Sequence, residues 1–327
     1  MPKSIAGCTR VTARPLGTVT LVLIACCLVN GCALDPGGYE APAAVGIDVI
    51  LTPLEQYGDG SAPLITESGG RRQLGHATAV AASGGQVFVV DSSIPGLVHL
   101  GAGQGDIRLL LDLDDGNTSG MHVTADLIIY VVDRYNRAVI ELSDSGWQRR
   151  IYSDSGRIPA PIDVTEINWG ATVLVADELT QRLVKFDTLS NPRGMLPPTL
   201  APVAVAASIE AIAASGNFVF VLDAASREVT QLDLEGRPVG TYGEDALLVP
   251  VAMTVDECQR MFVADGHADG LFVSSPDFYG TNSRAALPAE VTRAVTDLWI
   301  DGNELYVAAG PFGVRTFAVE PVCLGAL

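Results

Sequence analysis

Leu127-Ile-Ile-Tyr-Val-Val-Asp133, followed by Arg134-Tyr-Asn-Arg137, is the stretch that decides the fold of this 327-residue sequence. It is a short apolar run that stops on an aspartate and a polar turn, a pattern typical of a buried β-strand that enters a loop. The phrase recurs along most of the chain. Its copies end at Asp91, Asp133, Asp177, Asp223 and Asp265, and a sixth copy ends at Ala309, where the acid is lost.

The spacing of the six copies predicts the fold class. Subtracting residue numbers places successive copies 42, 44, 46, 42 and 44 residues apart. A turn rich in Gly and Asn precedes most copies, another apolar strand precedes the turn, and an alternating strand follows the aspartate. Repeats of about 40–50 residues built from strands are typical of propeller blades. We therefore predict an all-β protein, a six-bladed β-propeller of four-stranded antiparallel blades.

The two ends of the repeat indicate how the ring closes. No fourth strand follows residues 314–319 in the sixth copy, whereas residues 47–51 alternate like an outer strand. We expect this N-terminal strand to complete blade six, because closure removes exposed sheet edges. In blades three and five, segments rich in Pro or in Ser and Asn, 187–203 and 274–290, are expected to replace the fourth strand.

One copy resembles a known repeat. Asp133-Arg-Tyr-Asn-Arg-Ala-Val139, after its apolar strand, resembles the NHL repeat, whose blades carry an apolar strand, an aspartate, an Asn-containing turn, an arginine and a β-branched residue. The third and fourth copies keep the acid and a later arginine, and the first and fifth keep only the acid. The resemblance covers roughly residues 75–318 and implies the propeller fold, which serves many functions.

The N-terminus is typical of an export signal. A basic segment with Lys3, Arg10 and Arg14 precedes a mostly apolar run over 16–29, whose uninterrupted part is shorter than a membrane-spanning helix requires. The run ends in Val-Asn-Gly-Cys32, which resembles a bacterial lipobox, in which the cysteine is lipidated and becomes the mature N-terminus. A second match to the lipobox pattern ends inside this apolar run. The alternatives to a lipoprotein signal are an ordinary cleaved signal peptide and an uncleaved membrane anchor.

Lipidation at Cys32 implies both the domain organisation and the location. Residues 1–31 are then a lipoprotein signal peptide, residues 32–46 a flexible tether, and residues 47–327 the propeller. Ala33 is not the aspartate that retains such proteins at the inner membrane. The resemblance therefore implies a lipid anchor in the outer membrane of a bacterial envelope, with the body in the periplasm or at the cell surface.

Charge limits the partners. The formal net charge is −18. Such a body repels nucleic acid and anionic lipid surfaces, so we expect no nucleic acid and no membrane contact beyond the lipid. The acidity keeps an exported protein soluble, and recognition of cations or basic partners is the alternative.

The five repeated aspartates have a structural interpretation and a functional one. A carboxylate at the end of a strand accepts hydrogen bonds from the N–H groups of the next loop, as in an Asx-turn. The alternative is a ring of acids on one face that binds a cation or a basic ligand. We expect the structural role because the acid repeats.

Few residues suggest a metal or a cofactor, and we expect neither. Asp265, His267 and Asp269 are three metal-capable side chains at alternate positions, and residues 112–117 resemble a calcium loop without its spacing or its closing glutamate. Solvated turns are the expected role of both.

The pair Cys258 and Cys323 remains after the signal and lipidation cysteines are set aside, and in an exported protein it predicts a disulfide.

Catalytic candidates are equally sparse. His76, Asp163 and Glu210 fall where innermost strands begin and are expected near the channel mouth, but no matching catalytic set accompanies them. We therefore expect an envelope lipoprotein that acts as a binding or scaffold module for a protein, peptide or glycan. The alternatives are a lactonase-like or amidating-lyase-like hydrolase or lyase with a site at the channel mouth, and a structural ring within an envelope complex.

Overall fold

The computed structural model describes part of one unit of the chain. The chain divides into Met1–Ala43 and Ala44–Leu327, and every described residue belongs to the second unit. The predicted signal peptide, Cys32 and the predicted tether lie outside the described residues. The described ranges are 49–57, 64–66, 71–72, 74–94, 96–101, 106–113, 120–167, 170–187, 192–195, 208–274 and 282–321.

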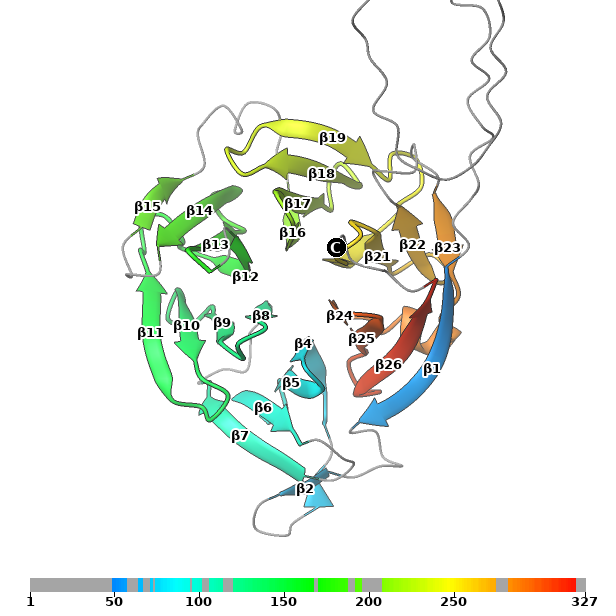
Figure 1. Ribbon diagram of the computed structural model, residues 1–327, viewed down its shortest axis with the longest axis horizontal. Helices are drawn as coiled ribbons and strands as arrows, with labels where there is room; N and C mark the ends of the chain where they lie inside the picture. The colour runs from blue at the N-terminus through cyan, green and yellow to red at the C-terminus, as the bar shows by residue number, and fades with distance from the viewer. Residues whose placement is uncertain are drawn as a thin grey trace, which may run out of the picture. The chain divides into compact units, whose positions relative to one another are not determined.

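Six sheets stand in a ring around a central channel (Figure 1). Blade 1 contains β4 (Ala77–Ser83), β5 (Gln86–Asp91), β6 (Gly96–Leu100) and β7 (Asp106–Asp112); blade 2 contains β8 (Met121–Val123), β9 (Ile129–Asp133), β10 (Ala138–Leu142) and β11 (Gln148–Ser153); blade 3 contains β12 (Pro161–Ile167), β13 (Thr172–Asp177), β14 (Arg182–Asp187) and β15 (Pro192–Met195). Blade 4 contains β16 (Ile209–Ser215), β17 (Phe218–Asp223), β18 (Glu228–Asp233) and β19 (Pro238–Tyr242); blade 5 contains β20 (Pro250–Val255), β21 (Met261–Asp265), β22 (Leu271–Ser274) and β23 (Ser283–Ala285); blade 6 contains β24 (Asp297–Asp301), β25 (Glu304–Ala308), β26 (Val314–Glu320) and β1 (Ile50–Tyr57). The prediction of a six-bladed propeller is confirmed.

The N-terminal strand closes the ring as predicted. β1 pairs antiparallel with β26, and the register joins Leu51 to Val319 and Tyr57 to Val314. The strand begins later and runs longer than the predicted 47–51. It extends to Tyr57 because β26 offers partners along its whole length. Blade 6 is therefore built from both ends of the propeller, so that its outer strand and its inner strands are far apart in sequence.

The outer strands depart from prediction in three blades. Residues 187–203 and 274–290 were expected to lack a strand, and this is wrong, because β15 and β23 lie within them. An outer strand needs hydrogen bonds to one neighbour only, so a short segment beginning at Pro192 suffices. Blade 1 carries two additional strands, β2 (Leu64–Thr66) and β3 (Arg71–Arg72), and β2 pairs in parallel with the outer strand β7.

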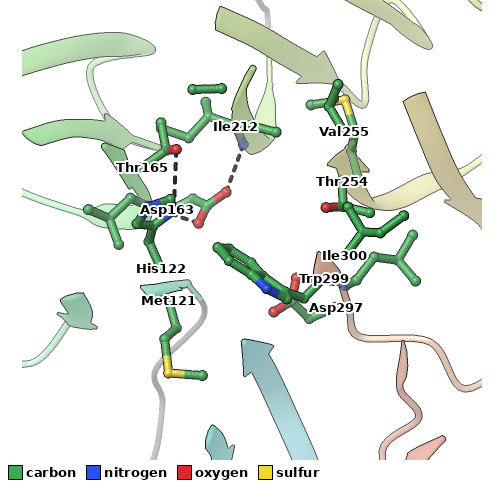
Figure 2. Close-up of a pocket in the computed structure, with 15 residues that line it drawn as sticks. Met121, His122, Asp163, Thr165, Ile212, Thr254, Val255, Asp297, Trp299 and Ile300 are labelled. Atoms are coloured by element: carbon green, nitrogen blue, oxygen red, sulfur yellow. Dashed lines mark hydrogen bonds between the residues drawn. The ribbon is translucent and has the colours of Figure 1, made fainter. Parts of the chain in front are cut away.

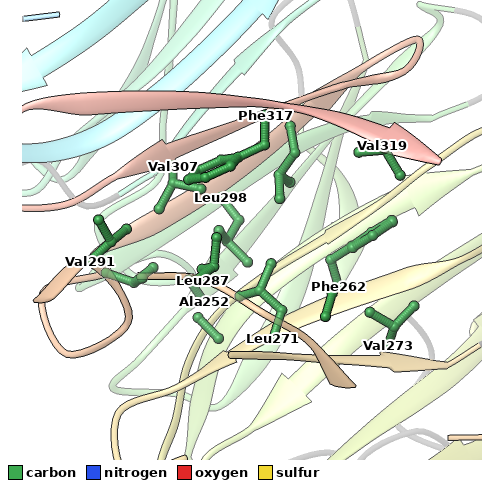
Figure 3. Close-up of a cluster of buried hydrophobic side chains, with 14 of the residues drawn as sticks. Ala252, Phe262, Leu271, Val273, Leu287, Val291, Leu298, Val307, Phe317 and Val319 are labelled. Carbon is green, nitrogen blue, oxygen red and sulfur yellow. The ribbon is translucent and has the colours of Figure 1, made fainter. Parts of the chain in front are cut away.

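The core lies between neighbouring blades. All residues of β9, β13 and β21 are buried, because second strands are covered by other blades on both faces. Between blades 5 and 6, Phe262 and Leu271 pack with Phe317 and Val319 (Figure 3). The one-turn helix α1 (Ala289–Thr292) contributes Val291 to this cluster. Six such clusters of described residues, each between two neighbouring blades, hold the innermost strands in position around the channel.

Within the described part of the chain, four of the five repeated aspartates, all but Asp133, accept hydrogen bonds from two loops. Asp177 accepts hydrogen bonds from Thr180 N (2.7 Å) in the loop to strand three and from Ala160 N (2.6 Å) just before strand one. Asp265 does the same with His267 N (3.0 Å) and Leu248 N (2.6 Å). Asp91, Asp133 and Asp223 also accept backbone hydrogen bonds from the following loop. These carboxylates therefore fix the face on which both kinds of loop lie, which we call the loop face.

Candidate functional site

A small cavity occupies the central channel (Figure 2). Its volume is about 140 Å³, and residues of the innermost strands of blades 2 to 6 line it. The polar lining residues are His122, Asp163, Thr165, Thr254, Asp297 and Trp299. Because five blades contribute, the cavity belongs to the channel itself rather than to one blade.

Two of its acids occupy equivalent positions in opposite blades. The repeated phrase forms the second strand of each blade and ends on the aspartate, or on Ala309 in blade 6. In each blade, one residue at the channel lies opposite the residue just before that last one. These residues are Ala79, Gly120, Asp163, Ala211, Ala252 and Asp297. Four are small, and the two acids lie three blades apart. The small residues leave room for the acids: a Cβ atom on Gly120 would lie 2.4 Å from Asp163 Oδ1.

Each acid joins its own blade to the next one. Asp163 accepts hydrogen bonds from Val164 N (2.8 Å) and, in blade 4, from Ile212 N (2.7 Å). Asp297 accepts them from Leu298 N (2.8 Å) and, in blade 1, from Val80 N (2.9 Å). The innermost strand of a blade has no further strand beside it, so its channel-facing N–H groups need other acceptors. The two carboxylates supply them at two opposite seams of the ring.

Burial makes both acids weak. It raises the pKa of Asp163 to about 7, with a smaller contribution from the charge of Glu210. It also raises the pKa of Asp297 well above its usual range, and the charge of Asp163 adds to this effect. A carboxyl group with a pKa near 7 is about half-protonated at neutral pH. Asp163 can therefore donate or accept a proton within the physiological range, which is the property required of a general acid or base.

His122 and Trp299 cover the channel beside the acids. The Trp299 indole donates a hydrogen bond from Nε1 to the carbonyl oxygen of Ala82 (2.7 Å) in blade 1. The His122 ring meets it edge-on, with ring centroids 5.1 Å apart and an interplanar angle of 75°. Burial lowers the pKa of His122 to about 4, so its imidazole is neutral at pH 7. It therefore supplies no positive charge to offset the two carboxyl groups.

The structure brings together only part of the set predicted from sequence. Asp163 lines the channel cavity, whereas Glu210 lies one residue before the position equivalent to Asp163 and does not line it. His76 also lies outside the lining, and its backbone N–H donates to Asp91 (3.0 Å). Burial and the nearby charge of Glu178 raise the pKa of Glu210. Of the three residues predicted near the channel mouth, Asp163 alone lines the cavity.

The candidate metal site is not assembled. Among the described residues, no three His, Cys, Asp or Glu side chains are placed to hold a metal ion. Asp265 is instead engaged by backbone N–H groups, which lower its pKa against the opposing effect of burial. Residues 114–117 of the calcium-like loop lie outside the described residues.

Cys258 is disulfide-bonded. Its predicted partner, Cys323, lies outside the described residues, so the pairing stays a prediction.

Asp297, His122 and Trp299 were not singled out from the sequence. The signal for Asp297 was present, because it stands 12 residues before Ala309 in blade 6 while Asp163 stands 14 before Asp177 in blade 3, by subtraction. The two-residue difference comes from the length of the hairpin turn between the first two strands. Without the backbone pairing, the equivalence of the two acids is hidden by that turn.

Comparisons with known proteins agree with the fold. No protein-family model matches the chain, and no curated protein matches it. Virginiamycin B lyase from Staphylococcus aureus is 12% identical with a TM-score of 0.56, and the match covers 85% of this chain and 90% of that chain. A gluconolactonase from Xanthomonas campestris is 13% identical with a TM-score of 0.58 and coverages of 84% and 98%. A protein of unknown function from Bacteroides thetaiotaomicron is 15% identical with a TM-score of 0.62 and coverages of 83% and 76%.

At these identities the similarity shows the propeller fold alone. The described residues contain no helix with the length and hydropathy needed to span a membrane.

Proposed function

We propose that this chain is a binding module that recruits a protein partner through its loop face. The observation that carries the proposal is a pair of exposed apolar side chains in neighbouring blades. Tyr135 is 65% exposed and Leu179 is 72% exposed. Each lies two residues after a loop-fixing aspartate, and an ion pair between Arg134 and Glu178 joins the two loops. Exposed aromatic and aliphatic side chains on rigid loops are typical anchors of protein interfaces.

The channel supports this choice over an enzyme. A cavity of about 140 Å³ is smaller than the ~300–1,000 Å³ of sites for drug-sized ligands. All four carboxylate oxygens of Asp163 and Asp297 already accept backbone hydrogen bonds. The acids therefore act first as braces between blades, while the loop face offers accessible apolar area.

The test is comparative capture of partners from native membranes. Wild-type protein and a Tyr135→Ser/Leu179→Ser variant are crosslinked and purified in parallel. Val239→Ser is the matched control, since Val239 is 56% exposed on the outer strand of blade 4. The proposal predicts a protein captured by wild type and control and lost with the double variant. Identical capture by all three overturns it.

The proposed location is the bacterial envelope, through a lipid on Cys32. The support is the lipobox-like sequence Val-Asn-Gly-Cys32 after a basic and apolar segment. Detergent phase partitioning of wild type and Cys32→Ser, expressed in a bacterium, tests it. Wild type is expected in the detergent phase and the variant in the aqueous phase. Equal partitioning contradicts the lipid anchor.

A lyase or hydrolase is the second candidate function. Two observations favour it: the paired channel acids with raised pKa values, and the fold shared with a virginiamycin B lyase and a gluconolactonase. Incubation with virginiamycin B and with gluconolactone, followed by mass spectrometry, tests it. Turnover that disappears in Asp163→Asn supports an enzyme, and absence of turnover leaves the binding module as the function.

A further inference from the structure

A second concave site lies where the ring closes. A groove of about 520 Å³ runs between the closing strand β1, blade 6 and the first hairpin of blade 1. Its lining residues are Leu54, Glu55, Tyr57, Gly85, Val87, Glu304, Tyr306 and Thr316. Two tyrosine–carboxylate pairs face it: Tyr57 donates to Glu55, and Tyr306 donates to Glu304 (2.7 Å). None of the described lining residues is a lysine or an arginine.

Backbone register shows what fills the corresponding place in blade 2. Tyr57 lies opposite Val314 as Tyr152 lies opposite Val139. By the same register, Thr316 corresponds to Glu141, because each lies opposite the tyrosine of strand two. Counting back from the outer-strand tyrosines, Leu54 and Glu55 correspond to Arg149 and Arg150. Blade 2 therefore has two arginines where blade 6 has the wall of the groove.

The arginines of blade 2 show what this arrangement holds. Tyr152 donates to the buried Glu141 (2.5 Å), and the same carboxylate lies 3.4 Å from Arg149 Nε and 3.5 Å from Arg150 Nη1. A tyrosine–glutamate pair at this seam thus has guanidinium groups against it. Blade 6 keeps both tyrosines, but its carboxylates come from other positions: Thr316 stands where blade 2 has Glu141, and Glu55 stands where blade 2 has Arg150. The described lining of its groove contains no guanidinium group.

The electrostatics of the groove favour a cation. Burial raises the pKa of Tyr57, and the hydrogen bond to Glu55 and the charges of Glu55 and Glu304 add to it. Burial and the hydrogen bond to Glu304 likewise raise the pKa of Tyr306. The phenols therefore stay neutral and present aromatic surface, while both glutamates are exposed carboxylates. Carboxylates beside aromatic rings are suited to bind a guanidinium or an ammonium group.

We propose that this groove binds the guanidinium group of an arginine side chain in a basic peptide or protein segment. The bound guanidinium group would lie against the Tyr57 and Tyr306 rings, between the Glu55 and Glu304 carboxylates. The groove lies at the closing strand, so occupation also ties β1 to blade 1. The proposal does not depend on the loop face, since Tyr135 and Leu179 are not part of it.

The test is titration calorimetry with three acetylated and amidated tripeptides, Gly-Arg-Gly, Gly-citrulline-Gly and Gly-Lys-Gly. Citrulline has the shape of arginine without the charge. We expect saturable binding of the arginine peptide at about 1 mM or tighter, weaker binding of the lysine peptide and none of the citrulline peptide. Loss of one charged hydrogen-bond partner in Glu55→Gln or Glu304→Gln should weaken binding about tenfold. Glu244→Gln, at an exposed position away from the groove, should change nothing.

A gain-of-charge variant separates binding from folding. Glu55→Arg places in blade 6 the residue that blade 2 has there, and it should abolish peptide binding while the protein keeps its circular dichroism spectrum. Equal binding of the citrulline peptide overturns the proposal, as does unchanged affinity in both glutamine variants. Absence of saturation up to about 10 mM overturns it as well.

Discussion

Replacing the channel acid Asp163 by asparagine should make the stability of the protein less sensitive to pH. Asp163 is half-buried in the channel lining, where desolvation raises its pKa from 3.8 in the unfolded chain to about 7 in the folded protein. The folded state therefore holds the proton more tightly than the unfolded state. Stability is full below about pH 4 and falls as pH rises towards 7, because the unfolded chain releases the proton first.

The magnitude follows from the two pKa values. A pKa difference from 3.8 to about 7 corresponds to a loss of at most about 4 kcal/mol in unfolding free energy above pH 7. Asparagine has the shape of the neutral acid and does not ionise. Its Nδ2 cannot accept the hydrogen bond of one of the two backbone N–H groups, Val164 or Ile212, which costs about 1–3 kcal/mol at every pH. We therefore expect Asp163→Asn to be less stable than the wild type near pH 4 and, as the wild type loses up to about 4 kcal/mol, to exceed its stability at pH 8.

The assay is urea denaturation followed by circular dichroism, from pH 4 to pH 8.5. The control is Asp126→Asn, at an exposed acid, which should follow the wild-type profile. A difference between Asp163→Asn and wild type that stays constant across the pH range would refute the reasoning. So would a variant that is less stable than wild type at pH 8.

Three further predictions concern the fold. Asp177→Ala leaves the N–H groups of Thr180 and Ala160 without their acceptor, and should lower the unfolding free energy by about 2–4 kcal/mol in denaturant titrations. Trp299→Ala removes the channel cover and its hydrogen bond to Ala82, and should cost about 3–5 kcal/mol in the same titrations. Deleting residues 1–57 removes β1 and leaves the edge of β26 unpaired, so analytical ultracentrifugation should show aggregation where a protein that lacks only residues 1–46 is monodisperse.

The fold was predictable because its signal is repeated. An apolar strand that ends in an acid is weak evidence once, whereas six copies of the strand at five similar spacings, five of them ending in the acid, are strong evidence. Closure by β1 was predictable because the sixth copy lacks a fourth strand. The short strands β15 and β23 were not predictable, because an outer strand is held by backbone pairing to one neighbour and needs little from its own side chains.

The channel was predictable only in part. Asp163 was placed near the channel from its position at the start of a strand. Asp297 and Trp299 depend on the register between the first two strands of blade 6, which a turn of different length conceals. The correspondence between the outer-strand positions of blade 2 and those of blade 6 depends likewise on a β-bulge in each of the two outer strands. Register is a property of pairing, and a single sequence does not display it.

The central claim is that the loop face, and not the channel, performs the function. The most direct measurement is quantitative crosslinking of partners to two double variants, Tyr135→Ser/Leu179→Ser and Asp163→Asn/Asp297→Asn, beside the wild type. The account predicts that the loop-face variant loses the captured partner and that the channel variant keeps it. Loss in the channel variant with retention in the loop-face variant would contradict the claim.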